Sequence, residues 1–330
     1  VDPESLKWLV EDIHKRLAWE AFQEVGITSQ IGRSLERTGT AAISWDPILI
    51  KEAVPLLKSQ CYNHLGYELD DTSAEIILWG ITLHMKQRGA IFYALLDKFV
   101  ETGGDFYYLN RISYLPNFGI HSPLPRFPAE DRCRMLDPVL SSSKKSWYLQ
   151  WLILHSNVGL LSDQNFYKNF FYYVMDCLTK TGLILERYTN KNIRVWGLNP
   201  NKITITSNLV RMKSGHEYFY LPRIWLDSLN GFPSLKLSQY QSETEHYHSH
   251  WELADNEENF YRTFFLEGDI ERVIGHEHTG LLSREDRERV EIQFKAKGEQ
   301  RQPWYENLLS ATPTLEMGID IGDLSSVILA

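Results

Sequence analysis

The sequence contains little cysteine and no long apolar run, and each absence excludes a class of protein. Its three cysteines, Cys61, Cys133 and Cys177, lie far apart and indicate neither a disulfide framework nor a zinc site. No stretch of about 20 apolar residues occurs, which excludes a membrane-spanning helix. No charged segment followed by an apolar one opens the chain, as a secretory signal would. We therefore expect a cytoplasmic location and no membrane partner.

Two nucleotide-binding patterns are missing as well. The sequence has no Gly-x-x-x-x-Gly-Lys-Ser/Thr loop to cradle phosphates. It also has no Asp-Glu-x-His or Asp-Glu-Ala-Asp segment to hold magnesium. We therefore predict that this polypeptide, by itself, hydrolyses no nucleotide.

The remaining composition is that of a globular protein with more than one domain. The chain has 330 residues, of which 43% are hydrophobic and 23% charged. It starts at Val1 and ends with the apolar run Ser325–Ala330, which we interpret as a buried strand. We expect the chain to be an internal piece of a longer protein.

Residues 1–125 are predicted to form a helical accessory domain. Apolar residues at helical spacing predict helices from Pro47 to Cys61 and from Thr72 to Val100, the latter capped by Thr72 or Ser73. The proline-rich segment His121–Pro128 cannot continue a helix and indicates a linker.

Residues 126–206 carry a different pattern, helix, helix, then hairpin. The helices are predicted over Ser146–His155 and Asp163–Lys180, and the strands over Leu183–Arg187 and Ile193–Leu198. This order is typical of a winged-helix-like module, although any small α+β subdomain would also account for it.

The charge of this region favours the first of these interpretations. Residues 141–213 contain ten Lys and Arg and three acids, a net charge of +7 within a chain of net charge −9. A local excess of positive charge is what binding to phosphates requires. We expect Lys180 at the end of the presumed recognition helix, and Lys191 and Arg194 on the presumed wing, to contact nucleic acid.

Residues 207–262 are predicted to be an insertion or connector. This segment is acidic and contains His246, His248 and His250, which would share one face of a strand and resemble a set of metal ligands. No cysteine lies nearby and no helical His-x-x-x-His spacing occurs. A solvated acidic loop is the simpler interpretation, so we predict no metal there.

Residues 263–330 alternate between strand and helix patterns, which predicts α/β organisation. Ser283, with Asp286 three residues later, resembles a capping box and predicts the start of a helix that runs through Phe294. An apolar strand, Asn307–Leu309, follows. Ligands of such sheets bind at loops beyond the carboxyl ends of the strands.

Two motifs in this last segment resemble those of a known family. Ala311-Thr312, five residues, then Gly318-Ile319-Asp320 resembles motif V of superfamily-two helicases, in their second RecA-like domain. The segment from His278 through Arg287 to Phe294 resembles their motif IVa, with one extra residue between His278 and Arg287. The longer form of the first motif, with Ile27–Glu36, is similar to large bacterial DEAD/DEAH-box helicases of phage-defence systems, especially the Druantia type.

The resemblance implies both a fold and roles for particular residues. It implies a mixed α and α/β chain whose residues 263–330 begin a RecA-like parallel domain. Thr312, Thr279 and Arg287 would contact the nucleic-acid strand, expected to be DNA, and Gly318 and Asp320 would contact nucleotide. ATP and Mg²⁺ would be the cofactors of the intact helicase, and its first RecA-like domain the principal partner. Self-association and other defence proteins are further partners that it implies.

Two other functions remain open at this point. The chain is either part of that ATP-dependent translocase or a nucleic-acid-binding module with a degenerate, non-hydrolysing helicase half. A third interpretation is a protein-interaction scaffold whose aromatic-rich insertion is the contact surface.

Overall fold

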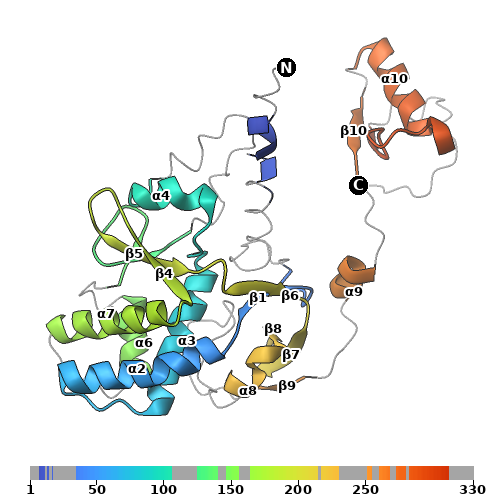
Figure 1. Cartoon of the computed structure of the whole chain (residues 1–330). Coiled ribbons are helices and arrows are strands. Elements are labelled where there is room, and N and C mark those ends of the chain that lie inside the picture. Colours follow the sequence, from blue (N-terminus) through green and yellow to red (C-terminus); the bar gives the residue numbers. More distant parts are fainter. Residues whose placement is uncertain are drawn as a thin grey trace. The chain divides into compact units, whose positions relative to one another are not determined.

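A computed structural model describes most of the chain, which divides into two compact units, Val1–Leu266 and Glu267–Ala330 (Figure 1). The chain mixes α-helices with several small β-sheets. The described residues are 7–11, 13–14, 17, 35–105, 125–139, 146–155, 164–214, 217–229, 251–254, 260–267, 273–279 and 282–311.

Long helices build one side of the first unit: α2 (Ile48–Leu65), α3 (Asp71–Gln87), α6 (Trp147–His155) and α7 (Gln164–Lys180). Helix α2 packs against both α3 and α7, and α6 packs against α3 (Figure 1). The apolar side chains of Phe170, Phe171, Val174 and Leu178 on α7 are buried. No helix among the described residues combines the length and the apolar character needed to cross a bilayer.

Helix α3 differs from the prediction at both ends. Its N-cap is Asp70, whose carboxylate accepts hydrogen bonds from both the backbone N–H (2.8 Å) and the hydroxyl (2.7 Å) of Ser73. The helix ends at Gln87 because Gly89 adopts a left-handed φ of 67°, so a single helix reaching Val100 was the wrong prediction. Two short helices follow, η1 (Ala94–Leu96) and α4 (Asp97–Glu101).

A four-stranded sheet of order β3-β2-β5-β4 lies beside these helices. Its strands are β2 (Pro128–Ala129), β3 (Asp137–Pro138), β4 (Ile184–Tyr188) and β5 (Arg194–Leu198). The last two form the antiparallel hairpin that the sequence predicts. Residues 125–128 are no linker: Phe127 is fully buried and stacks on Phe92, with ring centroids 5.2 Å apart.

Two smaller sheets complete the first unit. Strand β1 (Ala42–Trp45) pairs antiparallel with β6 (Ile203–Thr206), and the other sheet has the order β8-β7-β9. The indole N–H of Trp225 donates to the carbonyl oxygen of Trp45 at 2.9 Å, which ties the two regions together. The remaining elements are β7 (Leu209–Ser214), β8 (Glu217–Pro222), η3 (Arg223–Trp225), α8 (Leu226–Leu229), β9 (Trp251–Leu253) and α9 (Phe260–Glu267).

One hydrophobic core draws on residues from Ile43 to Leu229. It therefore crosses the positions 125/126 and 206/207, at which the sequence suggests domain boundaries. A partly buried ion pair supports the same packing: the ammonium of Lys86, whose side chain is only 4% exposed, lies 2.6 Å from the carboxylate of Glu36.

The second unit contains a parallel strand pair joined by a helix. Strand β10 (Gly275–His278) leads to α10 (Arg284–Lys295) and then, through η4 (Gly298–Gln300), to β11 (Leu308–Ala311). Val290 is the buried residue of α10. This is the strand, helix, strand order expected from the sequence.

Candidate nucleic-acid interface

The carboxyl ends of β10 and β11 form the first candidate surface. The two strands are parallel and His278 pairs with Ala311, so both strands end at the same level. Thr279 follows β10 directly, and Thr312 is the next residue in the sequence after β11. This edge is where a parallel α/β sheet binds its ligands.

Three of the predicted site residues, Thr312, Gly318 and Asp320, lie outside the described residues. The structure therefore gives no geometry for the predicted motif V. It does describe β11, which directly precedes this motif, and the neighbouring strand β10 with helix α10.

The start of α10 is fixed by its N-cap. Ser283 is the N-cap, as predicted: its hydroxyl oxygen accepts from the backbone N–H of Asp286 at 3.1 Å and donates to the Asp286 carboxylate at 2.7 Å. The N–H of Leu282 donates to the carbonyl oxygen of Thr279 at 3.2 Å. These bonds hold partly buried Thr279 close to the first turn of α10.

Arg287 lies one turn further along the same helix. Its side chain is partly buried, and its Nε–H is buried without a hydrogen-bond partner. A buried donor without an acceptor costs free energy, so the position favours a ligand that supplies an acceptor oxygen. The structure thus brings Thr279 and Arg287 to opposite ends of the same short loop-to-helix connection.

His278 is a polar residue to which the sequence assigns no role of its own. It is 2% exposed, its Nε2 lies 2.9 Å from Oε1 of Glu291, and its Nδ1 is buried without a partner. The interaction ties the end of β10 to the third turn of α10. The only sequence signal for it was the place of His278 at the head of the predicted motif IVa.

The hairpin of β4 and β5 supplies the second candidate surface. Its turn is anchored by Thr189, whose hydroxyl accepts from the N–H groups of Lys191 (3.3 Å) and Ile193 (3.1 Å). The N–H of Asn190 donates to the carbonyl oxygen of Glu101 at 2.6 Å. Asn192 adopts a left-handed φ of 58°, a conformation that asparagine tolerates. Lys191 is therefore held exposed on a fixed turn.

Arg194, in contrast, is committed to an ion pair. Its Nη2 and Nε donate to the two carboxylate oxygens of Glu130, at 2.8 and 3.1 Å. The Arg194 guanidinium holds the pKa of Glu130 below its usual range, so both partners stay charged at neutral pH. Lys180 is paired too, with its ammonium 2.6 Å from the carboxylate of Asp176.

These pairs reduce the positive field that the sequence predicts. Arg187 forms a further ion pair, with Asp97, and both Asp97 and Glu130 come from outside the basic region. Among the described residues of the basic region 141–213, the exposed cations without an ion pair are Lys168, Lys191 and Lys202. Of the three cations in the basic region that are predicted to contact nucleic acid, Lys191 has no ion pair with a described residue, while Lys180 and Arg194 are neutralised.

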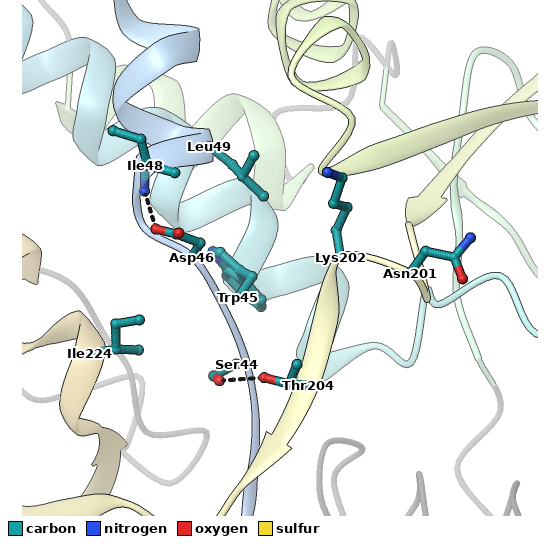
Figure 2. A pocket seen from close by; sticks show the side chains of 9 residues that line it. All are labelled: Ser44, Trp45, Asp46, Ile48, Leu49, Asn201, Lys202, Thr204 and Ile224. Atoms are coloured by element: carbon teal, nitrogen blue, oxygen red, sulfur yellow. Dashed lines mark hydrogen bonds between the residues drawn. The ribbon is translucent and has the colours of Figure 1, made fainter.

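A pocket of about 460 Å³ lies over the β1–β6 pair (Figure 2). Figure 2 shows the hydroxyls of Ser44 and Thr204 facing each other at 3.3 Å, while the Asp46 carboxylate accepts from the N–H of Ile48 at 2.9 Å. Asp46 thus satisfies the start of α2 and would repel an anion there. No group of His, Cys, Asp and Glu among the described residues is suited to hold a metal ion, and His246, His248 and His250 lie outside those residues.

Comparison with known proteins adds nothing to this geometry: no protein-family model, no curated protein and no solved structure matches the chain.

Proposed function

We propose that the chain is part of an ATP-dependent nucleic-acid helicase of superfamily two, acting in bacterial defence against phage. The supporting observation is the β10–α10–β11 unit, two parallel strands that end level with each other and lead into Ala311-Thr312. Motif V of these helicases would follow such a strand. Residues 263–330 would then begin the second RecA-like domain, and 126–206 would be a winged-helix-like module.

The proposed roles follow from this placement. Thr312, Thr279 and Arg287 bind phosphates of the tracked strand, a contact that positions the strand without reading its sequence. Gly318 and Asp320 contact the bound nucleotide. ATP and Mg²⁺ are held mainly by a first RecA-like domain that this sequence does not contain, in a cytoplasmic protein whose substrate is DNA.

Arg287→Gln tests the strand contact. We expect it to weaken binding of single-stranded DNA by about 10- to 100-fold, because a hydrogen bond to a charged group contributes about 1.5–3 kcal/mol. The slope of log affinity against log salt should fall by about one. Binding is measured by fluorescence anisotropy over a salt series, with thermal unfolding as the check on folding.

Arg289→Gln is the matched control, since Arg289 lies on the same helix but is exposed and paired with Asp286 at 2.9 Å. It should leave affinity nearly unchanged. Equal losses for the two variants would mean that any charge on α10 matters equally, and would remove the assigned contact.

The absence of the phosphate loop leads to a second expected result. The chain should release no phosphate from ATP, with or without DNA, in a coupled phosphate-release assay. Turnover by this polypeptide that rises on addition of DNA would contradict the assignment of its domains.

The same absence favours one alternative, a nucleic-acid-binding module that never hydrolyses ATP. The full reading frame separates the two functions. An upstream Gly-Lys-Ser/Thr loop and DNA-stimulated ATPase in the complete protein support the helicase, and their absence supports the module.

A further inference from the structure

Two exposed tyrosines lie beside Arg194, at the turn end of the β4–β5 hairpin. Tyr188 is 50% exposed at the end of β4, and Tyr172 is 37% exposed on α7. Together with Lys168 and Arg194 we call them the tyrosine patch. Of the neighbouring aromatic residues of α7, Phe170 and Phe171 are buried and Tyr173 is partly buried, so Tyr172 lies on the more exposed face of the helix.

Arg194 holds the tyrosine patch together. It pairs directly with Tyr188 in the register of the hairpin, so both side chains lie on the same face of the sheet. Its guanidinium carbon lies 4.5 Å from the centroid of the Tyr172 ring. The bidentate ion pair with Glu130 fixes the guanidinium of Arg194, which therefore serves as a rigid support for the two rings.

The second ring is also fixed in place. The hydroxyl of Tyr188 donates to the Glu186 carboxylate at 2.6 Å. Rigid aromatic rings that face solvent need little ordering when a flat ligand stacks on them. Exposed Lys168 on α7 and Lys191 on the hairpin turn provide unpaired positive charge on the two elements that carry the rings.

We infer that the tyrosine patch binds single-stranded nucleic acid, with unpaired bases stacked on Tyr188 and Tyr172 and phosphates near Lys168 and Lys191. The inference rests on the proposed function and narrows its substrate. Stacking on aromatic side chains combined with positive charge is how proteins hold single strands without reading sequence.

The same geometry disfavours a duplex at this surface. The bases of a duplex already stack on each other and leave no free face for a tyrosine ring. A helix that enters a duplex groove needs cations for the flanking phosphates. On this side of α7 and the hairpin, however, Lys180 and Arg194 are held by Asp176 and Glu130.

Binding of the full chain to three fluorescein-labelled probes tests the inference: a mixed-sequence single strand, its duplex, and an abasic strand of the same length. Tyr188→Ala and Tyr172→Ala should each weaken single-strand binding about 5- to 150-fold, the range that loss of one stacked base produces. Tyr188→Phe keeps the ring and loses only its hydrogen bond to Glu186, so it should bind much more like the wild type than Tyr188→Ala does. Neither alanine variant should change the already weaker binding of the duplex and abasic probes.

Tyr62→Ala is the matched control, because Tyr62 is 67% exposed and lies on α2, which carries none of the residues of the tyrosine patch. It should not alter binding of any probe. Thermal unfolding shows that each variant is folded, and Tyr188, at the end of a strand, is the substitution least able to disturb the core.

Two results would overturn the inference. One is unchanged single-strand binding by both alanine variants while Arg287→Gln still loses affinity, which leaves the proposed function standing. The other is an equal loss on the single strand and the abasic strand, which would show that phosphates alone are bound. If instead the tyrosine variants lose affinity and Arg287→Gln does not, the tyrosine patch stands and the helicase contact fails.

Discussion

Replacing Gly80 with alanine is expected to destabilise the first unit by about 1–3 kcal/mol, the usual cost of overpacking a core. Gly80 lies inside α3, where the indole of Trp151 from α6 sits directly on its backbone. An added Cβ would lie 2.1 Å from Cε2 and 2.3 Å from Nε1 of that ring. The clash outweighs the gain in helix propensity of up to about 1 kcal/mol that alanine brings.

Urea unfolding followed by circular dichroism measures this loss, and a double-mutant cycle isolates its cause. Trp151→Ala alone should cost about 3–5 kcal/mol through the cavity it leaves. In that background Gly80→Ala should become neutral or stabilising, since nothing then opposes the new methyl group. If Gly80→Ala costs the same in both backgrounds, contact with Trp151 is not the reason for the glycine.

Acid is expected to destabilise the first unit strongly, because histidines are buried in their neutral form. Burial, assisted by the positive charge of Arg88, lowers the pKa of His84 from 6.5 to about 3. Burial lowers the pKa of His155 to about 4. Below pH 6.5 the unfolded chain binds protons that the folded chain does not, so stability is full above that pH and falls as the pH drops toward 4. Buried His84 contributes a slope of up to about 1.4 kcal/mol per pH unit, and partly exposed His155 contributes less because solvent screens it.

His84→Phe removes one titrating group while keeping a ring against Trp147, whose centroid lies 3.8 Å from that of His84. Between pH 6 and 4 the urea midpoint of this variant should fall less steeply than that of the wild type. His64→Phe, at an exposed position on α2, is the control and should follow the wild type. Parallel curves for all three proteins would rule out His84 as the acid-sensitive group.

Local sequence patterns predict the local elements of this fold well. The apolar stripe before Gly182 predicts α7 to within one residue of its start at Gln164, and the alternation after it predicts the β4–β5 hairpin. Strand β2 was not predicted, because the proline-rich segment that leads into it suggests a linker. Burial of the adjacent Phe127 instead holds β2 in the sheet. The pairing of β1 with β6 could not be predicted, because hydrophobic periodicity carries no information on which distant segments of the sequence pair.

The candidate site shows the same difference between local features, which the sequence predicts, and long-range contacts, which it does not. The cap at Ser283 involves residues three apart and is visible in the sequence. The bidentate ion pair between Arg194 and Glu130 joins residues that are 64 positions apart. A count of charges along a segment of the chain therefore does not show that the charge of Arg194 is neutralised. The unpartnered nitrogens of His278 and Arg287 depend on packing, which no spacing reveals.

The long separation between paired elements also sets an order of events during synthesis. The hydroxyls of Ser44 and Thr204 meet across 160 residues of chain, and Trp225 bonds to Trp45 across 180. At about 5–20 residues per second, a ribosome needs roughly 10–30 s to deliver β6 after β1 has emerged. During that interval the apolar side chains of β1 have no strand beside them. Until β6 emerges, β1 therefore presents an unpaired strand edge, a feature that favours aggregation of the nascent chain.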